Sequence, residues 1–235
     1  MIPLTASEIT PDKLSRIRGI CFDMDGVLTD TEPLGNRILG QALLRQNCRA
    51  DEAQERCLLG VNMQTVRKYL LSWFPGCIDP DRFIADWCEM MHDEIHLHGL
   101  PVKPGAGNVL RALRERGYLL ALCTSNTASV VNDYLAVAGW DSGIFDSVIT
   151  GDLVAHGKPA PDIYLMGAEH LGLDPADCLG VEDSFNGVQS VRAAGMRCVM
   201  IPDTMPFSDR FSPYVDILLP DLYTLLSVTE RSKKS

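Results

Sequence analysis

The chain has 235 residues, a formal net charge of −10 and 22% charged residues, as in an ordinary globular protein. Its acidic balance and its lack of a basic stripe with interleaved aromatic residues argue against nucleic-acid binding. No apolar run approaches the ~20 residues that span a bilayer. We therefore expect a cytoplasmic protein, a monomer or a weak dimer, without nucleic-acid or membrane partners. The eight cysteines include no Cys-x-x-Cys pair, so we expect reduced thiols rather than disulfides or a zinc site.

Apolar periodicity predicts alternating strands and helices along most of the chain. Strands are predicted at residues 17–22, 119–123, 147–150, 178–181, 197–201 and 215–219. Helices are predicted at residues 108–116, 128–138, 161–171 and 184–194 and from residue 221. This alternation indicates an α/β core with a doubly wound parallel sheet, formed by residues 1–32 and 103–235.

The interval between the first two strands is too long for an ordinary connection. Four helical patterns fill it, at residues 35–46, 50–59, 63–73 and 80–98. We predict a separate α-helical domain over residues 33–102, inserted into the core. Trp73, Phe74 and Trp87 are expected to form its packing centre.

Two carboxylates follow the first predicted strand. Asp23 and Asp25 are two residues apart, so in an extended segment they point to the same side, while Gly26 allows the backbone to turn away. Converging carboxylates can bind a hard cation, although many aspartates at strand ends only cap the next helix.

Three later predicted strands also end in polar residues. Open α/β sheets place their sites at the carboxyl ends of their strands, so these residues should gather near Asp23. They are Thr124, Ser125 and Asn126 after the second strand, Lys158 after the third, and Glu182 and Asp183 after the fourth.

Phosphoryl transfer accounts for these residue types. A phosphate monoester repels a carboxylate nucleophile, so Asp23 can attack phosphorus only if a cation neutralises part of the charge. Asp25 can give a proton to the leaving oxygen and later take one from water. The remaining phosphate oxygens need donors, which the Thr124 hydroxyl, the Ser125 and Asn126 backbone amides and the Lys158 ammonium can supply.

The order and context of the four segments resemble the haloacid dehalogenase-like superfamily, especially its branch of β-phosphoglucomutase and small phosphate-monoester phosphatases. The matching segments are residues 23–32, 124–126, 157–162 and 182–187. The resemblance covers about Ile17 to Gly195. It implies a Rossmann-like core, an α-helical cap that closes over the carboxylates, and a cis peptide bond between Lys158 and Pro159.

The resemblance also implies a Mg²⁺-dependent phosphatase with a covalent aspartyl-phosphate intermediate. Its Mg²⁺ ligands would be the Asp23 carboxylate, the Asp25 backbone carbonyl and the Asp183 side chain, with Glu182 bound directly or through water. The expected partner is a small phosphorylated metabolite, with sugar phosphates among the candidates.

Two cap positions depart from the β-phosphoglucomutase pattern. Gly35 stands where that enzyme has a histidine, and Met63 stands where it has an arginine that grips a second phosphate. Hydrolysis is therefore favoured over a mutase reaction, and we expect Asn62, Met63 and Gln64 to set substrate specificity. The alternatives are a hexose-phosphate mutase and a catalytically silent binding or regulatory protein with the same fold.

Overall fold

The computed structural model describes residues 2–58 and 63–229, with the backbone alone described at residues 11, 12, 52, 56, 63, 64 and 142. The chain forms two compact units, one of Met1–Thr29 with Val102–Ser235 and one of Asp30–Pro101. Thr29 and Val102 form an antiparallel bridge in the first unit. In the second unit, the Asp30 backbone N donates to the Pro101 carbonyl at 2.8 Å. The second unit is therefore an insertion whose two ends lie side by side.

The first unit is built on a six-stranded parallel sheet with the order β3-β2-β1-β4-β5-β6. Its strands are β1 (Gly19–Phe22), β2 (Leu119–Cys123), β3 (Ser147–Ile149), β4 (Cys178–Glu182), β5 (Arg197–Met200) and β6 (Ile217–Leu218). Strand β1 lies between β2 and β4, with Phe22 opposite both Leu122 and Val181. The strand order reverses between β1 and β4, which is where open α/β sheets bind ligands. The predicted doubly wound parallel fold is confirmed.

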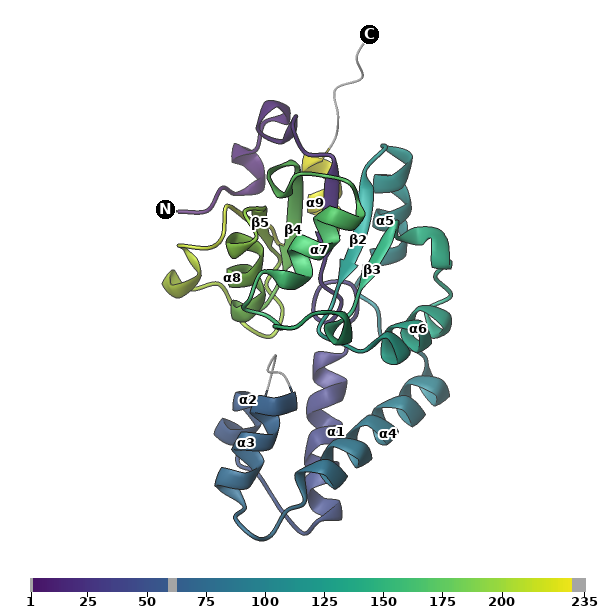
Figure 1. The fold of residues 1–235 in the computed structure, drawn as a ribbon, viewed down its shortest axis with the longest axis vertical. Helices are drawn as coiled ribbons and strands as arrows, with labels where there is room; N and C mark the ends of the chain where they lie inside the picture. The colour runs from purple at the N-terminus through teal and green to yellow at the C-terminus, as the bar shows by residue number, and fades with distance from the viewer. Residues whose placement is uncertain (1, 59–62, 230–235) are drawn as a thin grey trace. The chain divides into compact units, whose positions relative to one another are not determined.

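The first unit also contains helices, several of which pack on its sheet. They are α5 (Ala106–Glu115), α6 (Ala128–Val137), α7 (Asp162–His170), α8 (Phe185–Ala193) and α9 (Leu222–Val228). Helix α7 packs on β1, β2 and β3, α8 packs on β4 and β5, and α5 packs on β2 and α9. Figure 1 shows α7 and α8 in front of the sheet and α9 behind it.

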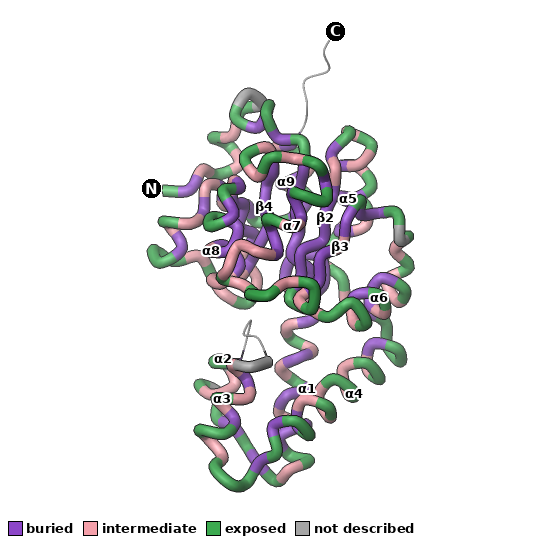
Figure 2. Tube along the Cα trace, viewed as in Figure 1, coloured by how far each residue is buried: buried purple, intermediate pink, exposed green. Residues whose placement is uncertain are grey.

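The strands form the buried centre of this unit, as the purple tube in Figure 2 shows. Every residue of β1 and β4 is buried. Strands covered on both faces read as continuous apolar runs rather than as alternating patterns. This is why the sequence predicted them as uninterrupted hydrophobic segments.

The second unit contains the helices α1 (Glu32–Arg45), α2 (Glu52–Cys57), α3 (Met63–Trp73) and α4 (Pro80–His98). The Asp79 carboxylate caps α4 by accepting hydrogen bonds from the backbone N of Asp81 and Arg82, at 3.0 and 3.2 Å. The expected packing centre is wrong. Leu70 and Phe83 are fully buried, whereas the three aromatic residues predicted for this role, Trp73, Phe74 and Trp87, are partly buried around them.

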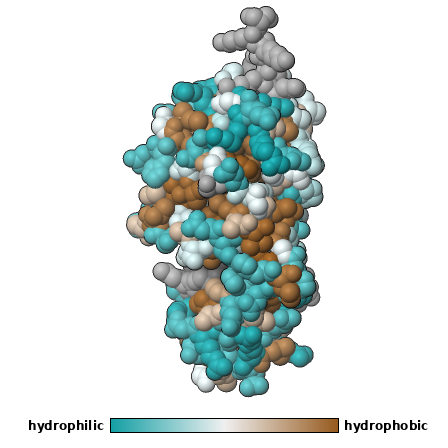
Figure 3. Space-filling model, turned by 90° about the vertical axis from the view of Figure 1, so that its right-hand side faces the viewer, coloured by the Kyte–Doolittle hydropathy of each residue, from teal (hydrophilic) through white to brown (hydrophobic). Residues whose placement is uncertain are grey.

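The surface and the thiols agree with the composition. On the face drawn in Figure 3, hydrophilic side chains cover much of the surface and hydrophobic side chains form patches among them. Within residues 2–58 and 63–229, no helix has the length and apolar character needed to cross a bilayer. All eight cysteines are free thiols; Cys57, Cys77 and Cys88 are exposed and the others are buried.

Candidate active site

The carboxyl ends of β1, β2 and β4 bring most of the predicted site residues together. The Asp23 backbone N donates to the Val181 carbonyl at 3.0 Å, which continues the ladder between β1 and β4 by one residue. Thr124 is tied in the same way to the Ile149 carbonyl, at 3.0 Å. Because these strands are parallel and in register, the residues that follow them share one edge of the sheet.

Three carboxylates form an acidic cluster at this edge. One oxygen each of Asp23, Glu182 and Asp183 lies within 4.8 Å of the others. Gly26 makes this approach possible, since its φ is +82° and a Cβ there would lie 2.3 Å from Asp183 Oδ2. The turn after β1 thus packs its bare backbone against the Asp183 carboxylate.

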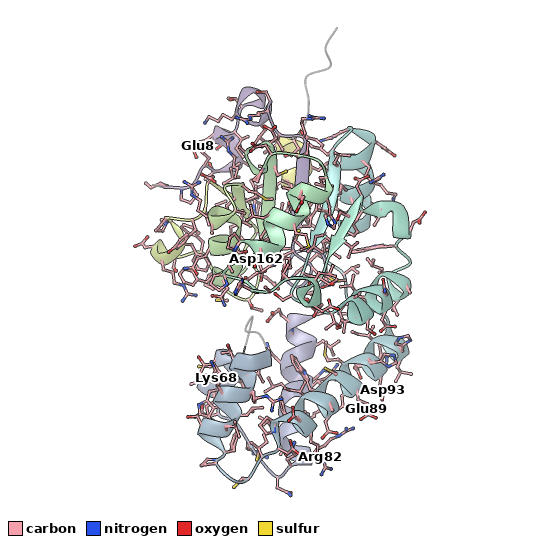
Figure 4. All side chains as sticks on the ribbon, in the orientation of Figure 1. Glu8, Lys68, Arg82, Glu89, Asp93 and Asp162 are labelled. Carbon is pink, nitrogen blue, oxygen red and sulfur yellow. The ribbon has the colours of Figure 1, made fainter. Side chains whose placement is uncertain are left out.

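Lys158 joins two members of the cluster. Its Nζ lies 2.5 Å from Asp23 Oδ1 and 2.6 Å from Glu182 Oε1, and only 7% of its side chain is exposed. The loop that carries it begins beside α7, where Asp162, labelled in Figure 4, accepts a hydrogen bond from the His156 backbone N at 3.3 Å. The Lys158–Pro159 peptide bond is cis, as predicted.

Glu182 is the most completely enclosed member of the cluster, with no exposed surface. Its Oε1 accepts from the Tyr164 hydroxyl at 2.8 Å and from Lys158. Its Oε2 accepts from the Asp183 and Ser184 backbone N and from Ser184 Oγ, at 3.2, 3.3 and 3.1 Å. Helix α8 can begin this close only because residue 187 is glycine, where a Cβ would lie 1.9–2.1 Å from the carboxyl atoms. Glu182 is thereby a fixed anchor for Lys158.

Burial and charge set the protonation of this cluster. Burial raises the pKa of Asp23 to about 8, although the Lys158 ammonium pulls it down. For Lys158, burial opposes the charged form, but the Asp23 and Glu182 carboxylates outweigh it and raise the pKa. One ammonium is therefore not enough to keep Asp23 fully ionised near neutral pH. Burial, followed by the Glu182 charge, raises the pKa of Tyr164 well above its usual value, so its hydroxyl stays a neutral donor.

The donor set fits a hard divalent cation. The cluster offers only oxygen ligands, and its three carboxylates outnumber the single ammonium of Lys158. A cation against Asp23 would offset the burial that disfavours its ionised form. Since five hydrogen bonds already reach the Glu182 oxygens, the geometry favours contact between Glu182 and such a cation through water rather than directly.

The second predicted carboxylate, Asp25, accepts hydrogen bonds from Asn126 and Thr29. Its Oδ2 accepts from Asn126 Nδ2 at 2.7 Å, and its Oδ1 lies 3.3 Å from Thr29 Oγ1. The Asn126 backbone N donates to Thr124 Oγ1 at 3.2 Å. Thr124 is buried, while Ser125 is exposed before α6 begins. Phosphate binding by Thr124, Ser125 and Asn126 stays a prediction.

The predicted specificity residues lie at the edge of what the structure describes. Asn62 is outside the described residues, and Met63 and Gln64 are described only as the first backbone positions of α3. Gly35, which stands where β-phosphoglucomutase has a histidine, is a buried residue of α1. Its carbonyl accepts a hydrogen bond from Trp87 Nε1 at 3.3 Å.

Tyr164, Thr29 and Gly187 are part of the site and were not predicted from the sequence. Tyr164 lies in the amphipathic pattern of α7, which looks like ordinary core. Thr29 and Gly187 lie within the motif segments, so the sequence could have indicated that they belong to the site, although it could not have predicted their contacts.

The fold and this cluster define an α/β protein with an acidic site at the switch point of its parallel sheet. A family model described as haloacid dehalogenase-like hydrolase matches residues 17–195. The chain belongs to this family and to its phosphatase branch. It is accordingly an enzyme rather than the catalytically silent protein among the alternatives.

Relatives and solved structures agree with this assignment. Protein CbbY of Rhodobacter capsulatus is 33% identical, over 88% of this chain and 94% of its own length. Hexitol phosphatase A of Escherichia coli is 31% identical, over 88% of this chain and 92% of its own. The crystal structure of CbbY from Rhodobacter sphaeroides in complex with phosphate has a TM-score of 0.75 at 25% identity, covering 88% of this chain and 95% of that one.

Proposed function

We propose that this enzyme is a Mg²⁺-dependent phosphatase that hydrolyses a small phosphate monoester through a phosphorylated Asp23. The observation that carries the proposal is the position of Lys158, whose Nζ lies between Asp23 and Glu182 at 2.5 and 2.6 Å. A buried carboxylate is a usable nucleophile only if nearby positive charge favours its ionised form. Lys158 supplies part of that charge and can also donate to a phosphate oxygen.

The residues support a two-step reaction. In the first step an Asp23 oxygen attacks phosphorus, the bond from phosphorus to the leaving oxygen breaks, and Asp25 gives that oxygen a proton. In the second step water attacks the phosphorus, Asp25 takes a proton from this water, and the bond to Asp23 breaks. Phosphate leaves and the Asp23 carboxylate is restored. Thr124, Ser125, Asn126 and Lys158 are the proposed donors to the phosphate oxygens.

The acidic cluster is the proposed Mg²⁺ site. Asp23, Asp183 and the Asp25 backbone carbonyl would hold the ion, with Glu182 reached through water. When bound, the ion supplies the positive charge that lets an anionic nucleophile approach an anionic phosphate.

A sugar or polyol phosphate is the proposed substrate class. The similarity to hexitol phosphatase A supports this class, and Asn62, Met63 and Gln64 remain the proposed specificity residues. A mutase must also hold a second phosphate, and the sequence has Gly35 and Met63 where β-phosphoglucomutase has its histidine and arginine.

Phosphate release from a panel of hexose, hexitol and pentose phosphates tests this function. We expect free phosphate from at least one of them and no isomer from β-glucose 1-phosphate. The control is Asp23→Asn, prepared and assayed in parallel to exclude contaminating phosphatases. Efficient formation of glucose 6-phosphate would identify a mutase instead, and no phosphate from any substrate would reject the proposal.

Removal of divalent metal should abolish this activity. We expect loss of phosphate release in chelator, recovery with Mg²⁺ and inhibition by Ca²⁺, because Ca²⁺ prefers longer bonds and more ligands and would engage both Asp23 oxygens. Mg²⁺ should also raise the melting temperature of the parent, since an ion that binds only the folded state stabilises it. Full activity in chelator, or a melting temperature insensitive to Mg²⁺, would contradict the metal assignment.

A further inference from the structure

Asp25 accepts a hydrogen bond from the Asn126 side chain, which follows a strand that contributes no residue to the acidic cluster. Asn126 Nδ2 lies 2.7 Å from Asp25 Oδ2, a short hydrogen bond. Asn126 follows β2, whereas the Lys158 and Glu182 contacts come from the loop before α7 and from β4. The proton donor and the nucleophile are therefore positioned by separate parts of the core.

The Asn126 hydrogen bond to Asp25 is shorter than the contact of Asp25 with Thr29. Thr29 Oγ1 lies 3.3 Å from Asp25 Oδ1 and 3.2 Å from the Met24 carbonyl. A hydroxyl has one hydrogen, so these two acceptors compete for it. The Asn126 side-chain amide donates to Asp25 Oδ2, and its N···O distance is more than half an ångström shorter than the distance from Thr29 Oγ1 to Asp25 Oδ1.

Asn126 is itself rigidly placed. Its backbone N donates to Thr124 Oγ1 at 3.2 Å, and its carbonyl accepts from the Gly151 backbone N at 2.8 Å. Thr124 in turn is buried and continues the ladder to β3. The side-chain amide therefore starts from a backbone fixed to two strand ends, as a precise positioning group requires.

We propose that the Asn126 side chain is a positioning residue that holds Asp25 as proton donor and directs its proton to Oδ1. This inference rests on the proposed phosphatase function. An amide N–H that donates to Oδ2 needs a lone pair there, so the proton of the acid form resides on Oδ1. Thr29 can then turn its hydrogen to the Met24 carbonyl and accept from that oxygen until the leaving group takes the proton.

The role of Asn126 can be separated from phosphate binding by the leaving group. An aryl phosphate such as 4-nitrophenyl phosphate expels a stable anion that needs no proton, whereas an alkyl phosphate expels an alkoxide that does. A group that only binds phosphate affects both substrates equally. A group that aims the acid affects only the alkyl substrate.

The experiment measures kcat/KM of Asn126→Ala and Asn126→Leu on 4-nitrophenyl phosphate and on the best alkyl phosphate of the panel. We expect a loss of about 10- to 100-fold on the alkyl substrate, part of the full effect of a general acid. On 4-nitrophenyl phosphate the change should not exceed that of the control Asn132→Ala, an exposed asparagine of α6. kcat/KM is used because it reports the steps up to phosphorylation of Asp23.

Inhibition by inorganic phosphate provides a second readout, because phosphate binding does not require protonation of a leaving group. It should be the same for the parent, both Asn126 variants and Asn132→Ala. Asn126→Leu keeps roughly the size of the side chain and removes its donor without adding charge, so it guards against a packing defect in Asn126→Ala.

Equal losses on both substrates, weaker inhibition by phosphate or no loss at all would each overturn the positioning role. The failure of the proposed function looks different, because then the parent itself releases no phosphate from any monoester.

Discussion

Replacing Asp23 by asparagine should abolish phosphate release, lowering kcat by about 10⁴-fold or more. An amide is a poor nucleophile, and Glu182, the other carboxylate that contacts Lys158, is fully buried with hydrogen bonds on both of its oxygens. The fold should persist, since the side chain changes by one atom. The measurement is single-turnover phosphate release with the circular dichroism spectrum as a check of folding. Near-parental turnover in the purified variant would show that Asp23 is not the nucleophile.

The same substitution should change how stability depends on pH. Burial raises the pKa of Asp23 to about 8 in the folded chain, against about 3.9 for an unfolded aspartate. Between these values the folded state binds more protons than the unfolded state, so this group lowers the stability of the parent as pH rises. Asparagine does not ionise. In metal-free buffer, the free energy of unfolding of the variant relative to the parent should therefore increase between about pH 5 and about pH 8.

Replacing Lys158 by methionine should damage both catalysis and stability. We expect kcat/KM to fall about 10²- to 10³-fold, the usual cost of losing one donor to a developing charge. The free energy of unfolding should fall by about 3–5 kcal/mol, because Asp23 and Glu182 lose the cation between them while remaining buried. Phosphatase kinetics and urea denaturation measure the two effects.

Lys103→Met is the matched control for this variant. Lys103 also forms a partly buried ion pair, with its Nζ 2.6 Å from Asp203 Oδ1, and it takes no part in the acidic cluster. It should lose stability and keep its activity. If Lys103→Met and Lys158→Met lose activity to the same extent, the effect of Lys158 is a general consequence of destabilisation rather than of phosphoryl transfer.

The sequence predicted the sheet well because each buried strand is a continuous apolar run. Strand β2 has its predicted bounds, Leu119–Cys123, whereas β6 covers only Ile217–Leu218 of the predicted residues 215–219. Helix bounds were less accurate. Helix α1 begins at Glu32, whereas the prediction placed its start at Gly35. The first turn was missed because it contains Pro33 and has no apolar periodicity.

Positions in the site were predictable, but contacts between side chains were not. The carboxyl ends of parallel strands meet at one edge, so gathering Asp23, Thr124 and Glu182 required only the strand assignments. The Tyr164 bond to Glu182 depends on how α7 packs on the sheet, which periodicity does not give. For Asn126, the sequence suggested a backbone donor to phosphate, and only the structure shows its side chain on Asp25.

The neighbouring ends of the inserted unit have an evolutionary consequence. Because Thr29 and Val102 face each other across a bridge, the core needs only a short turn to continue from one to the other. Any foreign segment whose own ends meet at a similar spacing can be accommodated there without altering a single strand. Selection can thus exchange or lengthen the inserted helical unit while the strands that carry the acidic cluster are inherited unchanged.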